Sequence, residues 1–268
     1  MKFTEVSLSD KINTPASELY PVVSGDEKKL VFIRRLKFYD ALFYSTKDDG
    51  KWSDPINITP DIGSDGEYYP TSLSADGHEL YLVRRTEHGS DIYVSYLKNM
   101  RWTKAEKLDM TVNSLSNENA AAISDDGKFL FICSDRRGGR GRFDLYISKK
   151  GKTGAWSKPK NLGKIINTAF DESSPVAIKN GNVLFFSSKG HFNMGGYDIF
   201  YSILENKKWT IPVNIGSPIN NNGDNTFYYT IGNGRTAYIS RFGANGENED
   251  IYKLVIKSNL PDFTNKKK

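Results

Sequence analysis

Short apolar runs recur along the chain between polar, turn-rich stretches, and no segment shows the 3.6-residue period of an amphipathic helix. Most of these runs follow a turn signal such as Asp126-Gly127, which favours a tight reversal of the chain before a strand. The runs occupy residues 30–33, 80–83, 130–133, 183–186 and 237–240. Their regular return indicates one structural unit copied five times.

Two further landmarks repeat in phase with the apolar runs. An aspartate opens an aromatic-rich segment 51 to 54 residues apart, at Asp40, Asp91, Asp144, Asp198 and Asp250. A tryptophan follows in the first four copies, at Trp52, Trp102, Trp156 and Trp209. Each repeat therefore predicts four short strands, named a to d: a precedes the turn, b is the apolar run, c begins at the aspartate and d at the tryptophan. Four-stranded units at this period are typical of propeller blades.

The ends of the chain predict how the ring closes. The fifth copy ends without a tryptophan, whereas Phe3 lies 49 residues before Trp52 and is in phase with that series. The N-terminal strand is thus expected to complete the last blade as its outer strand, which leaves no broken blade at the seam. We predict an all-β, five-bladed β-propeller of four-stranded antiparallel blades over residues 1–256, with 257–268 as a C-terminal tail or linker.

Composition and charge restrict the function only loosely. The 268 residues carry a net charge of +5, which is too small an excess to indicate a nucleic-acid partner. A single cysteine, Cys133, excludes an internal disulfide and is expected to be a small buried residue. No apolar run approaches the roughly 20 residues of a membrane helix, so we expect no direct membrane insertion. The first residues lack the apolar core of a signal peptide.

The motifs of the repeat resemble a known family. Blade three carries Gly138-Gly139 before Asp144, then Trp156-Ser157-Lys158-Pro159 and an Ile-Asn-Thr ending at Thr168. This pattern resembles the WD40-like (TolB-type) repeat of bacterial envelope proteins, found beside OmpA-like domains in PorE-like lipoproteins of the type IX secretion system. The resemblance implies an exported scaffold, periplasmic or associated with the outer membrane. Blades one and two lack the double glycine.

Acidic residues stand before strand a in four of the blades. They are Glu18, Glu67, Glu118 and Glu172, with Asn225 at the fifth position. In a propeller this loop lies at one mouth of the central channel, so the carboxylates could form a ring that holds a cation. Because the acid recurs from blade to blade, we favour the alternative that each one accepts hydrogen bonds from its own loop or pairs with a neighbouring blade.

Basic and aromatic residues gather at the end of strand b and in the loop to strand c, which face the same mouth. These candidates for partner binding are Arg34, Arg35, Arg84, Arg85, Arg136, Arg137, Arg140, Arg142, His191, Phe192 and Arg241. A guanidinium group suits a partner carboxylate or phosphate. The alternatives are pairing with the glutamates across blades and, for the loops, simple solvation.

No catalytic residue is evident in the sequence. The acids repeat symmetrically, whereas a glycosidase needs dissimilar carboxylates in one pocket. His78, His88 and His191 have no metal-ligand spacing, so we expect neither a metal nor a cofactor. The sequence therefore predicts a non-enzymatic module that docks a protein of the cell envelope. The alternatives are a propeller that binds carbohydrate or peptidoglycan and, less favoured, a five-bladed glycoside hydrolase.

Overall fold

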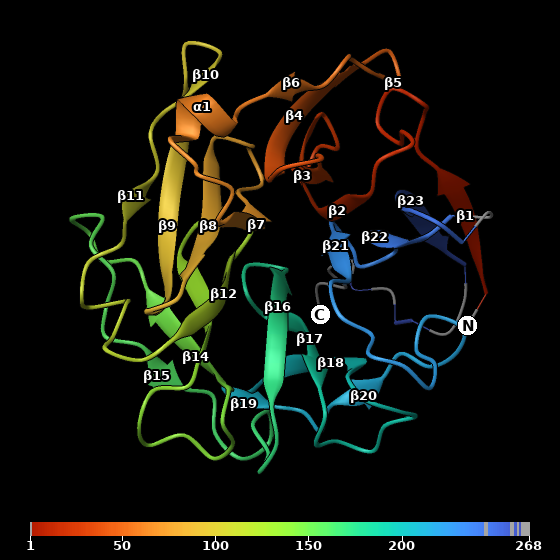
Figure 1. Cartoon of the computed structure of the whole chain (residues 1–268). Coiled ribbons are helices and arrows are strands. Elements are labelled where there is room, and N and C mark those ends of the chain that lie inside the picture. The colour runs from red at the N-terminus through yellow and green to blue at the C-terminus, as the bar shows by residue number, and fades with distance from the viewer. Residues whose placement is uncertain (1, 244–245, 258–259, 262, 264–268) are drawn as a thin grey trace.

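Five antiparallel sheets stand round one axis in the computed structural model, which describes residues 2–243, 246–257, 260–261 and 263 (Figure 1). Blade 1 contains β2 (Glu18–Val23), β3 (Lys29–Arg35), β4 (Asp40–Asp48), β5 (Lys51–Trp52) and β6 (Ile56–Asn57). Blade 2 contains β7 (Tyr68–Leu73), β8 (Glu79–Thr86), β9 (Gly89–Lys98), β10 (Arg101–Trp102) and β11 (Glu106–Lys107). Blade 3 contains β12 (Glu118–Ile123), β13 (Phe129–Ser134), β14 (Asp144–Lys149) and β15 (Lys160–Asn161).

The remaining two blades complete the ring. Blade 4 contains β16 (Glu172–Ile178), β17 (Val183–Ser188), β18 (Asp198–Glu205), β19 (Lys208–Trp209) and β20 (Val213–Asn214). Blade 5 contains β21 (Tyr229–Ile231), β22 (Thr236–Phe242), β23 (Glu249–Ile256) and β1 (Phe3–Ser7). One short helix that the sequence analysis did not anticipate, α1 (Thr59–Ile62), links blades 1 and 2. The predicted five-bladed propeller is confirmed.

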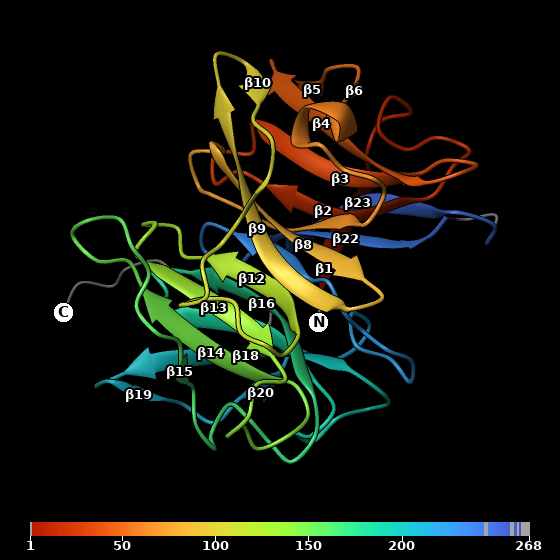
Figure 2. The same cartoon turned by 60° about the vertical axis from the view of Figure 1, so that its left-hand side comes forward.

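The predicted closure is also confirmed. β1 pairs antiparallel with β23, with Phe3 opposite Ile256 and Ser7 opposite Tyr252. The first strand of the chain is thus the outer strand of the last blade. Figure 2 brings blade 2 forward, where the corresponding outer strand β10 pairs with β9.

Each blade is tied to the segment that follows it by one polar side chain. Asn167 accepts a hydrogen bond from the Leu145 backbone N–H at 2.8 Å and donates to the Leu145 carbonyl at 2.9 Å. Asn13, Asn113 and Asn220 make the same pair of bonds with the equivalent residues of strand c, Ile251, Ile92 and Ile199. This role explains the repeated asparagine of the sequence motif, because it satisfies buried backbone groups at the blade edge.

The repeated aspartates of strand c also serve the fold where the double glycine is present. Asp144 is buried and accepts hydrogen bonds from the backbone N–H groups of Arg140 and Gly141 at 2.6 and 2.9 Å. In blade 2, which lacks that glycine pair, Asp91 instead forms an ion pair with Lys107 at 2.7 Å. These contacts give Asp144 and Asp91 a structural role.

The tryptophans of strand d pack onto the preceding blade. Trp102 of blade 2 meets Tyr44 of blade 1 edge-on, with ring centroids 5.7 Å apart. The predicted tail contributes to packing as well. Leu260 and Phe263 are buried, and the Phe263 ring lies 5.5 Å from that of Tyr201 between centroids. The packed part of the ring therefore extends beyond residue 256.

Candidate functional site

The loops that lead into strand a and the loops from b to c lie at one end of the blades, here called the mouth face. The register sets this arrangement, because Glu18 at the start of β2 pairs with Arg34 at the end of β3, and Arg35 pairs with Asp40 at the start of β4. The hairpin turns between strands a and b lie at the opposite end. All the partner-binding candidates therefore come from the same face.

Three of the predicted mouth carboxylates are fully buried: Glu18, Glu118 and Glu172. Each accepts two hydrogen bonds from the residue four positions earlier. In blade 1 these come from the Thr14 N–H at 3.0 Å and the Thr14 hydroxyl at 2.6 Å. The carboxylates close their own loops, as the favoured alternative predicted.

Glu67 does not belong to this set, which corrects the sequence alignment by one residue. Tyr68 occupies the position, since it pairs with Arg84 in the register where Glu18 pairs with Arg34. Glu67 itself is exposed, and Arg84 bonds Asp65 at 2.5 Å instead. The error arose because the lead-in loop of blade 2 carries its acid one residue before the strand.

Several basic candidates are bound within the fold. Arg34 donates to Glu18 at 2.7 Å and to the Ile12 carbonyl at 2.9 Å. Arg136 reaches Glu118 at 3.0 Å and the Val112 carbonyl at 2.7 Å, although it starts two residues further along the loop. His191 repeats the second contact through Nε2, which donates to the Ile166 carbonyl at 2.9 Å. We call this contact between a basic side chain and the preceding linker the loop pin.

In blade 4 the loop pin is made by His191 and not by an arginine. The hydroxyl of Ser188 donates to Glu172 at 2.8 Å, and no arginine of the described ranges forms an ion pair with this carboxylate. Burial raises the pKa of Glu172 to about 6, against the lowering effect of the hydrogen bonds from Thr168 and Ser188. Burial also lowers the pKa of His191, which favours its neutral form.

The other basic candidates are more exposed. Arg35 pairs with Asp40 at 3.3 Å, and Arg85 lies over the Tyr69 ring at 5.0 Å. Arg137, Arg140 and Arg142 are exposed and have no ion pair with any described residue. Phe192 is 96% exposed.

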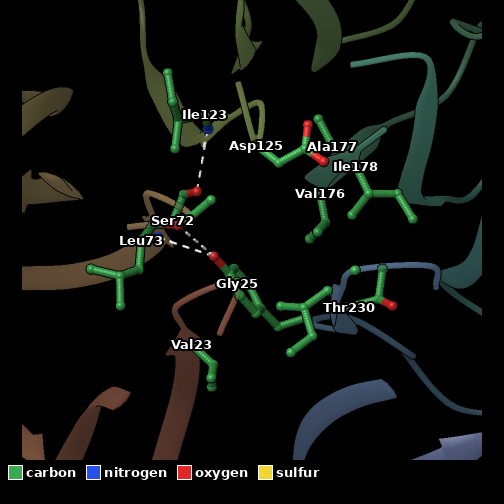
Figure 3. A pocket seen from close by; sticks show the side chains of 14 residues that line it. Val23, Gly25, Ser72, Leu73, Ile123, Asp125, Val176, Ala177, Ile178 and Thr230 are labelled. Carbon is green, nitrogen blue, oxygen red and sulfur yellow. Dashed lines mark hydrogen bonds between the residues drawn. The ribbon is translucent and has the colours of Figure 1, made fainter. Parts of the chain in front are cut away.

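The central channel is closed by side chains. The Tyr229 hydroxyl of blade 5 bonds the Leu73 backbone of blade 2, at 3.0 Å to the N–H and 3.1 Å to the carbonyl. Figure 3 shows Leu73 among the residues that line the cavity here. The cavity beside this contact measures only about 40 Å³. Within the described ranges, no group of three or more His, Cys, Asp and Glu side chains is placed to hold a metal ion.

A larger cavity opens where blade 5 breaks the repeat. Asn225 stands at the glutamate position, and β21 begins only at Tyr229, so this blade lacks the long inner strand of the others. Arg241 is equivalent to Arg34 but turns outward to Glu5 on β1. The loop pin of blade 5 is therefore missing, and a cavity of about 310 Å³ lies between blades 4 and 5.

The lining of this blade 5 cavity is about half polar and half apolar. It contains the side chains of Asn221, Asp224, Asn225, Ser240, Arg241 and Glu249, beside the apolar Ile219 and Phe242. Tyr228 and Ser240 also line it, and their hydroxyl groups are buried without a hydrogen-bond partner in the described structure. Burial raises the pKa of Tyr228, which keeps the phenol protonated. Buried polar groups are normally satisfied, so these two point to a ligand or water.

Two carboxylates line the cavity. Asp224 accepts a bond from the Tyr197 N–H at 2.8 Å, as Asp171 does from Phe143, so its position is part of the repeat. Glu249 corresponds in register to Asp40 of blade 1, whereas blades 2 to 4 carry Ser90, Phe143 and Tyr197 at this position. Sequence analysis missed this cavity; the only signal was the asparagine at position 225.

Solved structures with a similar overall fold include both a TolB protein and several glycosidases. TolB from Acinetobacter baumannii has a TM-score of 0.53 at 14% identity, and the match covers 91% of this chain and 56% of TolB. An α-L-arabinofuranosidase from Lactobacillus brevis has a TM-score of 0.56 at 13% identity, covering 96% and 99% of the two chains. A GH62 hydrolase solved with xylotriose has 0.54 at 12%, covering 94% and 96%. The likeness establishes the fold.

These comparisons change two expectations. No family model and no curated protein matches the chain, so membership of the WD40-like envelope family stays a prediction. The prediction that the chain is not an enzyme is wrong, because similar structures with TM-scores of 0.51 to 0.56 include four glycoside hydrolases. The symmetry of the repeated acids argued against an active site built from them. It did not exclude an active site at blade 5, where the repeat is broken. No described helix is long and apolar enough to cross a membrane.

Proposed function

We propose that the protein recognises a carbohydrate in the blade 5 cavity. The observation that carries the proposal is a cavity at the blade without the loop pin, in which the hydroxyls of Tyr228 and Ser240 have no partner among the described residues and lie beside the amides of Asn221 and Asn225. Hydroxyl and amide groups both donate and accept hydrogen bonds, which matches the hydroxyl groups of a sugar. The volume of about 310 Å³ is at the lower end of ligand sites, so it suits one or two sugar rings.

The apolar part of the lining supports the same ligand class. Phe242 is 64% exposed at the rim, and Ile219 is half-buried although its counterparts Ile12 and Ile166 are fully buried. Sugar rings present C–H faces that pack against such groups. The similarity to a hydrolase solved with xylotriose is consistent with the proposal but concerns the fold alone.

Restoring the repeat tests this proposal. Asn225→Glu places the carboxylate of the other blades in the cavity, and Tyr228→Phe removes one unpaired hydroxyl. Both variants should weaken binding of oligosaccharides, with xylotriose among the panel, measured by titration calorimetry. Arg85→Ala, an exposed change on the same face, should bind as the wild type does. If neither cavity variant alters the binding of any sugar that the wild type binds, the cavity is not the site.

Hydrolysis in the same cavity is the second candidate. It is favoured by Glu249, which has no carboxylate counterpart in blades 2 to 4 and lines the cavity together with Asp224. Two carboxylates flanking a sugar are what glycoside hydrolysis needs. Turnover of aryl arabinofuranosides and xylosides, lost in Glu249→Gln while sugar binding persists, would establish this activity. Binding without turnover across the panel would exclude it for these substrates.

We also propose a location in the cell envelope, periplasmic or associated with the outer membrane, where peptidoglycan and other glycans are available. The support is the resemblance of the repeat and the similarity in fold to TolB. Docking to an envelope protein belongs to the same proposal, since the exposed Phe192 and Arg137 lie on the mouth face. Fractionation of cells that express the full-length protein, with immunodetection, tests the location.

A further inference from the structure

We infer that the carbohydrate is an extended acidic polysaccharide, which runs from the blade 5 cavity over the mouth face of blades 4 and 3. This inference rests on the proposed function and names the ligand class. It depends on three features of the described residues: a continuous surface, exposed rings along it, and unpaired cations at its far end.

The surface is continuous because each loop from b to c touches the lead-in loop of the next blade. A Cβ on Gly141 of blade 3 would lie 1.8 Å from the Phe170 carbonyl of blade 4, so only glycine permits this approach. At the next junction, a Cβ on Gly195 would lie 2.5 Å from the backbone of Asn222. Asn222 is adjacent to Asn221 of the cavity lining. The loops therefore form an unbroken path from blade 3 to the cavity.

Exposed aromatic rings lie along this path. Phe170 at the junction of blades 3 and 4 is 60% exposed, and Phe192 in the blade 4 loop is 96% exposed. Phe242 at the cavity is 64% exposed. Rings that protrude singly from successive loops suit a ligand made of repeated flat units better than a protein, whose interface core would be a contiguous apolar patch.

The charge at the blade 3 end identifies the ligand as acidic. Arg137, Arg140 and Arg142 are exposed and make no ion pair with any described residue. In blades 1 and 2, by contrast, Arg35 pairs with Asp40 and Arg84 with Asp65, while Arg85 lies over the Tyr69 ring. A guanidinium group binds a carboxylate through two parallel hydrogen bonds, so sugars that carry carboxylates fit this loop.

Polygalacturonate is the probe that tests the inference, with dextran as the neutral polymer and poly-L-glutamate as a polymer with charge but no sugar. The double variant Arg140→Ala/Arg142→Ala should lower the affinity for polygalacturonate at least tenfold while leaving binding of a short oligosaccharide in the cavity unchanged. Phe192→Ala should act in the same direction. Arg85→Ala on blade 2 is the matched control and should bind as the wild type does. All these side chains are exposed, and an unchanged melting temperature verifies folding.

The outcomes separate this inference from the proposed function. If the double variant binds polygalacturonate as tightly as the wild type, the acidic ligand is refuted although the cavity still binds sugar. If poly-L-glutamate binds equally well through the same arginines, the path recognises acidic polypeptide and the inference also fails. If Asn225→Glu and Tyr228→Phe both leave sugar binding intact, the proposed function fails instead.

Discussion

Arg34 donates from Nε to Glu18 at 2.7 Å, and the two side chains are only 14% and 0% exposed. The guanidinium also lies 4.6 Å from the centroid of the Phe43 ring, so it joins the lead-in loop of blade 1 to strands b and c. Arg34 also makes the loop pin of blade 1 through its bond to the Ile12 carbonyl, and blade 5 lacks this pin. The stability of blade 1 and the cavity of blade 5 therefore both depend on which residues stand at these positions of the repeat.

Removing Arg34 should destabilise the protein strongly. In Arg34→Ala, Glu18 stays buried without its counter-ion, which costs about 3–5 kcal/mol for such pairs. Arg35→Ala is the control, because its ion pair with Asp40 is at the surface and is worth less than about 1 kcal/mol. Urea unfolding followed by tryptophan fluorescence measures both. Equal losses in the two variants would contradict the role given to the pin.

Glu172 should make stability depend on pH. Its folded pKa of about 6 exceeds the ordinary 4.5, so the folded state holds this proton more tightly than the unfolded state. Stability from this group is therefore full below pH 4.5 and declines as pH rises through 6, by about 2 kcal/mol. Glu172→Gln should remove that decline, because an amide does not titrate. Its oxygen can still accept from the Thr168 N–H, so the loop contact is kept. Denaturant unfolding between pH 4 and 8 measures it.

The control for this prediction is Glu118→Gln in blade 3, where Arg136 contacts the carboxylate. That variant should lose stability at every pH, since the guanidinium would lose its charged partner. A decline that persists in Glu172→Gln would show that another group titrates.

Replacing each of two neighbouring tyrosines by phenylalanine should affect different properties: stability for Tyr229 and sugar binding for Tyr228. Tyr229→Phe removes both bonds to Leu73 and leaves a buried N–H unpaired, at a cost of about 1–3 kcal/mol. Tyr228→Phe removes a hydroxyl without a partner in the described structure, so stability should hold while sugar binding weakens. Unfolding and calorimetric titration of both variants measure this contrast. A destabilised Tyr228→Phe would mean that its hydroxyl supports the fold.

Deleting residues 1–8 should lower the melting temperature. The deletion removes β1, exposes the edge of β23 and takes away the partly buried Phe3. Since about 1 kcal/mol corresponds to 2–4 °C in a protein of this size, the fall should be roughly 5 °C or more. Val6→Thr, a 49%-exposed position in the same strand, should change it little. Calorimetry tests both, and an unchanged melting temperature on deletion would refute the closure role.

The repeat made the architecture predictable, but the candidate site lies where the repeat fails. Asp144, Trp102 and the phase of Phe3 determined blades, packing and closure, because each copy reinforces the others. The alignment misplaced Glu67, since one-residue shifts in a loop leave the period almost unchanged. The partner of Arg241 could not be predicted, because Glu5 belongs to a strand at the far end of the sequence. Neither could the cavity, which depends on the short β21.

The pairing of β1 with β23 sets the order in which the ring can be completed during synthesis. β1 is made before the four intervening blades and its partner β23 only after them, so β1 has no neighbour while those blades are synthesised. The blades between them rely on contacts local to each repeat and can form in turn. A protein that binds extended strands, such as a chaperone, would meet β1 as a free edge throughout that interval.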